Sequence, residues 1–282
     1  MRALHLYRSA VGLMGLAGVL MTASPARAAR VLVVADLNAS GDGVIADYAT
    51  ADQNMINHLS TLYTVTALDD SAVTPADVAA SDAVIISHTT ASGTVRSSLP
   101  DVWLLNKPIM NMEPGLANYL GFNTFAFGGA EQAQGIRSSL EILNNAHPVT
   151  AGVSLGAISP YTTPSMMVWQ ALVNPGFYDP APGAAILARF VEPQFSLLAG
   201  GIMAVDKGAL LAANSRNNMG SDFPAADKRL AFFMGYGAFT NLTADGLKLF
   251  DQGVAWLVPE PTTLALLGIG LAAAARRRAG AS

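Results

Sequence analysis

Hydrophobic and polar positions follow two kinds of pattern along the first half of the chain, and the two kinds alternate. Short apolar runs rich in β-branched residues are typical of strands that are buried on both faces. Segments with apolar residues at three- and four-residue spacing are typical of helices that cover such a sheet. The predicted strands are 30–36, 63–69, 83–88 and 107–113, and the predicted helices are 47–62, 74–81, 94–106 and one that starts within 114–120.

The second half of the chain is less regular and has more proline and glycine, as in the connection 174–183. Neither an internal repeat nor a long low-complexity linker divides the chain, which indicates one domain with elaborated loops. Strands that alternate with helices are typical of a doubly wound, mostly parallel sheet, so the predicted fold class is α/β. The predicted elements of this half are strands at 184–191, 197–204 and 229–236 and a closing helix at 243–258.

Charge is distributed unevenly between the ends and the middle of the chain. Six of the 16 Lys and Arg residues and one of the 20 Asp and Glu residues lie in the two ends, so residues 29–258 carry ten basic and 19 acidic side chains, a net charge of −9. Nucleic acids and anionic lipids are bound by clustered Lys and Arg, so we expect neither partner for this acidic part. The chain has no cysteine, which excludes disulfides, thiolate zinc sites and cysteine nucleophiles.

The first 28 residues have the three-part pattern of a secretory signal peptide. A basic region with two arginines precedes an apolar run at 10–20, and Ala26 and Ala28 frame a small-x-small cleavage site. This order predicts export by the secretion machinery and cleavage after Ala28. The alternative is a buried amphipathic helix, for which the same three features would have to coincide at the terminus.

The chain ends in a second pattern of three parts, namely a Pro-Glu-Pro triplet, an apolar run and a basic cluster. The two prolines hold the triplet extended, since each fixes its own φ and disfavours helix in the residue before it. The apolar run 262–275 has 14 residues, whereas a stable membrane span needs about 20, so we expect a temporary anchor. The arginines fit the positive-inside rule and would stay cytoplasmic. The triplet and the cluster are Pro259, Glu260, Pro261, Arg276, Arg277 and Arg278.

Together these three parts resemble the PEP-CTERM sorting tail of Gram-negative bacteria. The resemblance implies recognition of the triplet by an exosortase, a membrane protease-transferase, with cutting near the triplet. It also implies an inner-membrane-tethered intermediate and delivery to the cell surface or extracellular matrix, often in association with exopolysaccharide. The expected organisation is a signal peptide at 1–28, an α/β domain at 29–258 and a sorting tail at 259–282.

The body of the chain has a resemblance of its own. The order of its elements, with phrases such as DAVIISH at 82–88 and HPVTAG at 147–152, is similar to the class I glutamine-amidotransferase-like and trehalose-utilisation-like α/β families. This similarity covers most of residues 30–258 and implies a flavodoxin-like three-layer sandwich with an elaborated second half. Amidotransferase activity is not carried over, because that chemistry needs a cysteine nucleophile. The sequence leaves open whether the chain is an enzyme, and the missing cysteine favours a protein without enzymatic activity.

Three predicted strands end in residues that can carry chemistry: Asp36, His88 and Glu113. Ligands of open parallel sheets bind beyond the carboxyl ends of the strands, so we expect these side chains at one edge. A histidine between two carboxylates is a candidate general base or metal ligand. The structural alternative is that such residues cap helices and satisfy loop amides.

The loop after the first strand has the oxygen spacing of a calcium loop. Asp36, Asn38, Ser40 and Asp47 occupy its first, third, fifth and twelfth positions, with a glycine at the sixth, as a seven-coordinate Ca²⁺ site requires. No helix enters this loop, and loops rich in Gly, Asp, Asn and Ser are also ordinary turns between a strand and a helix. Calcium is therefore a candidate cofactor, and no other is indicated.

Two hypotheses for function follow. The first is an exported, non-enzymatic protein of the surface or matrix, associated with exopolysaccharide. The second is a secreted carbohydrate hydrolase that uses Asp36, His88 and Glu113. The remaining central histidines, His58 and His147, are expected to be structural because neither falls at the ligand edge of the sheet.

Overall fold

The computed structural model describes residues 28–37, 46–101, 105–124, 133–169, 172–173, 179–190, 198–214, 217 and 219–258. The described residues belong to one compact unit, Ala28–Pro259. Ala26 and the tail from Pro259 to Arg278 lie outside the described residues, so the predicted cleavage site and sorting triplet are known from the sequence alone.

Four strands from the first half of the unit and one strand from near its end form the parallel part of a 10-stranded sheet, in the order β2-β1-β3-β4-β14. Each neighbouring pair in this series is parallel. The order corresponds to the 2-1-3-4-5 arrangement of flavodoxin-like folds. The strands are β1 (Arg30–Ala35), β2 (Thr64–Asp69), β3 (Ala83–Ile86), β4 (Ile109–Asn111) and β14 (Arg229–Ala231).

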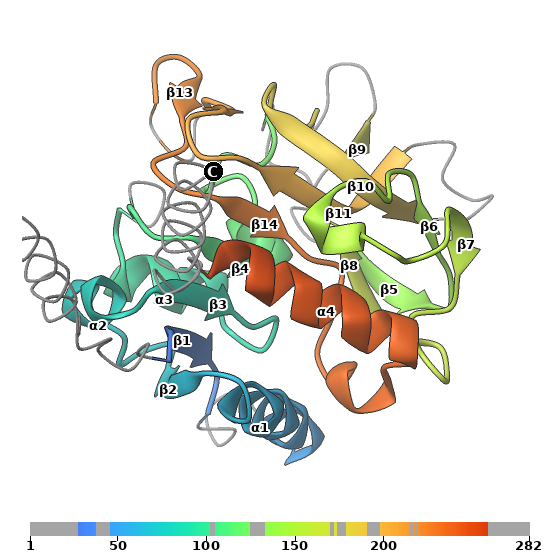
Figure 1. The fold of residues 1–282 in the computed structure, drawn as a ribbon. Coiled ribbons are helices and arrows are strands. Elements are labelled where there is room, and N and C mark those ends of the chain that lie inside the picture. Colours follow the sequence, from blue (N-terminus) through green and yellow to red (C-terminus); the bar gives the residue numbers. More distant parts are fainter. Residues whose placement is uncertain are drawn as a thin grey trace, which may run out of the picture. The chain divides into compact units, whose positions relative to one another are not determined.

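Helices cover both faces of this parallel part, which makes three layers (Figure 1). Alternate side chains of β1 explain the division, because Val33 packs with the helices of one face and Val34 with those of the other. On Val33's face lie α1 (Ala46–Ser60) and α4 (Ala244–Leu257); on Val34's face lie α2 (Pro75–Ala80) and α3 (Ser92–Ser98). The predicted α/β fold class and three-layer sandwich are confirmed.

The elaborated second half continues the same sheet with antiparallel strands, β11, β10, β6 and β7, beyond β14. A further strand, β9, pairs with β11. These strands are β6 (Leu140–Ile142), β7 (Gly156–Ile158), β9 (Leu172–Val173), β10 (Ala184–Phe190) and β11 (Leu198–Val205). Two small antiparallel pairs complete the described strands: β5 (Ala133–Arg137) with β8 (Ser165–Trp169), and β12 (Leu210–Leu211) with β13 (Phe223–Pro224).

Several predicted elements are shorter in the structure. The helix expected at 94–106 is α3, which ends at Ser98, because Pro100 disfavours helix in the residue before it. The helix expected from 114 is one 3₁₀ turn, η2 (Pro114–Leu116), followed by turns. The strand expected at 229–236 is β14, which ends at Ala231. The start of α2 is as expected, since Thr74 caps it and Pro75 is its first residue.

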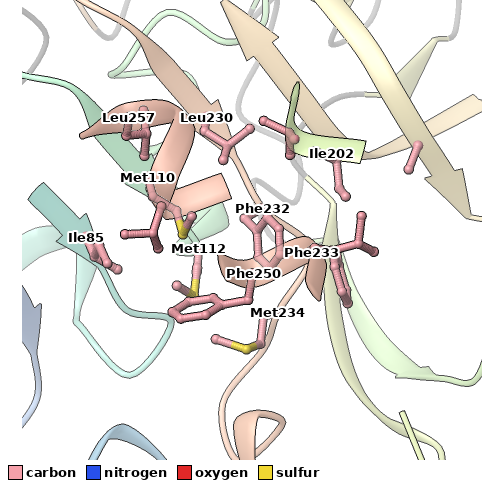
Figure 2. Close-up of a cluster of buried hydrophobic side chains, with 14 of the residues drawn as sticks. Ile85, Met110, Met112, Ile202, Leu230, Phe232, Phe233, Met234, Phe250 and Leu257 are labelled. Atoms are coloured by element: carbon pink, nitrogen blue, oxygen red, sulfur yellow. The ribbon is translucent and has the colours of Figure 1, made fainter. Parts of the chain in front are cut away.

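The core beneath α4 joins the parallel and antiparallel halves. Figure 2 shows the aromatic rings of Phe232, Phe233 and Phe250 packed among aliphatic and methionine side chains from β3, β4, β11 and β14. The rings of Phe232 and Phe233 are 4.7 Å apart between centroids, and Phe250 meets Phe232 edge-on at 6.1 Å. The cluster therefore holds α4 (red in Figure 1) against the middle of the sheet.

The amino ends of the parallel strands meet at one edge, where both ends of the described unit also lie. The backbone N–H of Thr64 donates to the carbonyl of Ala29, at the start of the unit. Lys228, just before β14, donates through Nζ to the carbonyl of Trp256 at 2.6 Å, in the last turn of α4. Arg229 is fully buried and donates to the carbonyl of Lys107 at 2.5 Å, which ties β14 to the segment before β4.

We predict that the contact between α1 and α4, the two helices on one face of the sheet, stabilises the fold modestly. His58 Nε2 lies 2.6 Å from Asp251 Oδ1, and both side chains are partly exposed. A double-mutant cycle of His58→Ala and Asp251→Asn should give a coupling of about 0.5–1 kcal/mol in the free energy of unfolding, because solvent screens the pair. Chemical denaturation measures it, and strictly additive effects would contradict the coupling.

Candidate functional site

The three candidate residues at the ends of predicted strands lie at the carboxyl edge of the parallel sheet. Asp36 follows β1 directly, and His88 and Glu113 lie two residues beyond the ends of β3 and β4. Because these strands are parallel neighbours, their carboxyl ends meet at one edge. The topology brings the three residues to that edge, as expected.

The strand order reverses between β1 and β3, and a buried carboxylate lies at that point. Asp52 of α1 accepts hydrogen bonds from Ser87 Oγ at 2.6 Å and from Thr89 Oγ1. The backbone N–H of Asp36 donates to the same Thr89 oxygen at 3.1 Å. Burial, aided by the charge of Asp36, raises the pKa of Asp52 to about 6, although the two hydroxyl groups act in the opposite direction.

The sequence itself marks Asp52 as unusual, although this residue does not follow a strand. Asp52 lies at helical spacing with Met55, Ile56 and Leu59, so it belongs to the apolar face of its helix. A carboxylate on an apolar face requires a buried partner. The hydroxyl groups that follow β3 supply that partner, and they also join α1 to the sheet.

Glu113 is buried, with 5% of its surface exposed. Its Oε1 accepts a hydrogen bond from the Gly115 N–H at 2.9 Å, so the side chain caps η2. Asn111 supports the same turn by donating from Nδ2 to the carbonyl of Glu113 at 2.8 Å. Burial raises the pKa of Glu113 to about 8, and the Gly115 bond offsets only part of that rise. The carboxyl group is therefore mainly protonated at neutral pH.

His88 packs against an aromatic ring from the neighbouring part of the sheet. It is 8% exposed, and its ring centroid lies 4.6 Å from that of Tyr236 with a tilt of 50°. Tyr236 follows β14 and is partly exposed. The segment predicted as strand 229–236 thus contributes to this edge an aromatic residue that is not among the three candidates at strand ends.

Two further carboxylates extend the acidic character of the edge next to β2. Asp69 Oδ2 accepts from the backbone N–H of Leu37 at 3.2 Å, and Asp70 Oδ2 accepts from that of Ala91 at 2.8 Å. Burial, followed by the charges of Asp69 and Asp36, raises the pKa of Asp70. The carboxyl edge is therefore a place where carboxylates hold loop amides.

The described residues contain no group of three or more His, Asp or Glu side chains placed to hold a metal ion. Of the predicted calcium ligands, Asn38 and Ser40 lie outside the described residues. Asp47 is in α1, and its side chain also lies outside them. The calcium loop accordingly stays a prediction.

The two other histidines in the described part of the chain make contacts within the fold. His58 approaches Asp251, as described above. His147 Nδ1 accepts from the backbone N–H of Val149 at 3.2 Å and thereby caps a 3₁₀ turn, η3 (Pro148–Thr150). Burial lowers the pKa of His147. These contacts fit the structural role expected from the sequence.

The C-terminal segment of the chain matches a known sorting motif. Residues 257–279 match the PEP-CTERM protein-sorting motif. The chain carries a PEP-CTERM sorting motif. This motif marks an exported protein of Gram-negative bacteria that is sorted by an exosortase through a membrane-anchored intermediate. No helix in the described parts of the chain is long and apolar enough to cross a membrane, and the apolar run of the PEP-CTERM tail lies outside those parts.

The body in front of the PEP-CTERM motif is similar in fold to a solved structure. A ThuA-like protein from Bacteroides uniformis is 12% identical with a TM-score of 0.52, over 87% of this chain and 98% of that chain. At this identity the similarity shows the fold alone. A β-galactosidase from Bifidobacterium adolescentis is 11% identical over 79% of this chain and 96% of that chain, with a TM-score of only 0.26. No curated protein matches the chain.

Proposed function

We propose that the chain is a protein of the cell surface or extracellular matrix that works without catalysis, in association with exopolysaccharide. The observation that carries the proposal is the sorting motif at residues 257–279. An exosortase would release the body, residues 29–258, from its temporary anchor near the Pro259–Pro261 triplet. The acidic, cysteine-free body would then act by binding.

The contacts at the carboxyl edge support the non-catalytic part of this proposal. The Glu113 carboxyl group caps η2, and Asp52 accepts from two hydroxyl groups that position α1. His88 and Glu113 are more than nine-tenths buried. Glu113 and Asp52 each hold a neighbouring part of the fold, and these contacts favour a structural role for the two carboxylates.

The experiment is size-exclusion chromatography of exopolysaccharide from the source bacterium after incubation with residues 29–258. We expect the protein to co-elute with polymer of unchanged size. Dextran of matched size is the control, and it should leave the protein at its own elution volume. Separate elution of protein and polymer would contradict the association with exopolysaccharide.

A second candidate function is a carbohydrate hydrolase that uses Asp36, His88 and Glu113. The observation in its favour is the pKa of about 8 for Glu113, since a carboxyl group that stays protonated at neutral pH suits a general acid. A shift of the polymer to smaller size in the same experiment would favour this function over binding alone.

The substitution His88→Ala separates the two candidates. If the edge is structural, we expect the variant to bind polymer as the wild type does and to lose roughly 1–2 kcal/mol of stability with the Tyr236 contact. A hydrolase would instead lose its depolymerising activity in a variant that remains folded. Reducing-end assays and thermal unfolding measure the two effects side by side.

A further inference from the structure

The sorting motif overlaps the folded body. The motif begins at residue 257, whereas α4 extends to Leu257 and Val258 is its C-cap. Leu257 is 1% exposed and Val258 is 8% exposed, and both belong to the core cluster beneath α4. The backbone N–H of Val258 donates to the carbonyl of Val254 at 3.0 Å. The folded unit therefore reaches the residue directly before Pro259.

Contacts from two sides hold this last turn of α4. Lys228 Nζ donates to the Trp256 carbonyl at 2.6 Å and lies 5.1 Å from the centre of the Trp256 ring. On another side the His147 ring meets the Trp256 ring edge-on, with 5.2 Å between centroids. Trp256 is thus fixed both to the start of β14 and to the segment before η3.

The sequence leaves little chain between this turn and the anchor. Only Pro259, Glu260 and Pro261 separate Val258 from the apolar run that starts at Thr262, and three extended residues span about 10 Å. A processing enzyme binds its substrate as an extended segment and acts on chains that are locally open. On the upstream side of the triplet, the residues that would enter such an enzyme are the buried ones of α4.

We propose that the last turn of α4, Val254–Val258, must open before the exosortase acts on the triplet, so that the folded body slows its own release. The inference rests on the sorting function given by the motif. Opening exposes three buried aliphatic side chains, those of Val254, Leu257 and Val258, and each one reduces the open population by about tenfold or more. When opening and closing are fast compared with cutting, the rate of processing follows that open population.

The test follows conversion of the full-length precursor to its processed form in the source bacterium, by pulse-chase and immunoblotting. Insertion of Gly-Ser-Gly-Ser between Val258 and Pro259 should speed processing at least fivefold, since the enzyme then has an open segment upstream. The same insertion after Gly220, which has open space around it, is the control and should leave the rate unchanged. An equal or slower rate with the spacer at Val258 would overturn the proposal.

A second pair of variants tests the contacts themselves. Lys228→Ala should speed processing severalfold, and this gain should vanish when the spacer is present. Lys248→Ala is the matched control, because Lys248 donates to the Gly152 carbonyl near the other end of α4 and should not alter the rate. If Lys228→Ala and Lys248→Ala change the rate equally, the last turn has no special role.

Failure of the sorting function has a separate signature. Replacement of the Pro259–Pro261 triplet by three alanines should abolish processing of both the wild type and the spacer variant. Processing that continues without the triplet would refute exosortase sorting itself. A triplet-dependent rate that ignores the spacer would refute only the opening of α4.

Discussion

Replacement of Glu113 by glutamine should make the protein more stable at alkaline pH. Glutamine keeps an oxygen that accepts the Gly115 N–H and removes the charge that burial disfavours. The pKa of Glu113 rises from an ordinary 4.5 to about 8 on folding, so the native state binds the extra proton. The stability linked to this proton is fully present below pH 4.5 and is lost as the pH rises through 8.

The size of this effect follows from the pKa difference. Between pH 5 and pH 9 the free energy of unfolding of the wild type should fall by roughly 4 kcal/mol more than that of Glu113→Gln. Asp52, whose pKa is also raised, contributes equally to both proteins and cancels in the comparison. Urea denaturation at a series of pH values measures the difference.

The control for this prediction is Asp101→Asn, which removes an exposed carboxylate and should follow the wild-type pH dependence. Parallel stability curves for the wild type and Glu113→Gln would show that Glu113 ionises at its ordinary pKa. In that case the Glu113 carboxyl group would be accessible to water in solution.

Replacement of Gly246 by alanine should destabilise the protein strongly, even though alanine is the better helix former. Gly246 lies in the first turn of α4, where a Cβ atom would stand 2.1 Å from the Pro160 carbonyl oxygen. That oxygen also accepts the Thr243 N–H, so the segment cannot move away without losing a contact. We expect a loss of about 3 kcal/mol and a fall of roughly 5–10 °C in Tm.

The matched control is Gly253→Ala in the same helix. Its Cβ would meet Met110 Cε at 2.9 Å and Leu230 Cδ2 at 3.0 Å, which are the ends of side chains that can rotate. The gain in helix propensity, about 1 kcal/mol, offsets part of the crowding, so the net change should stay within about 1 kcal/mol. Equal losses for the two variants, measured by thermal unfolding, would contradict the close approach at Pro160.

The parallel half of the fold was predictable because its signals are local. The run that forms β1 is continuous and β-branched, and the start of α2 has its cap and proline within a few residues. In the antiparallel half only the long strands β10 and β11 have such signals, and they were predicted within one residue of their bounds. β6 and β7 have three residues each, and β6 is set by its pairing with the distant β10.

The candidate site was predictable in position and less so in its contacts. Parallel strand ends must share an edge, so the placement of Asp36, His88 and Glu113 followed from the order of elements. The packing of His88 on Tyr236 did not, because it depends on where the chain goes after β14. Burial of Glu113 likewise depends on the tight turn at η2, which replaced a predicted helix.

The position of β14 has a consequence for the order of events during export. β14 lies between β4 and β11, so the centre of the sheet is closed by a strand from the end of the body. The signal peptide expected at 1–28 implies export from the amino terminus, which would deliver β1 to β4 long before this partner, and pairing between distant segments is slow. On that expectation the sheet would be completed only when the apolar part of the tail is next to leave, on a chain about to be tethered. Incomplete sheets expose strand edges that aggregate, and a tether that keeps each chain in place until β14 has inserted would guard against this.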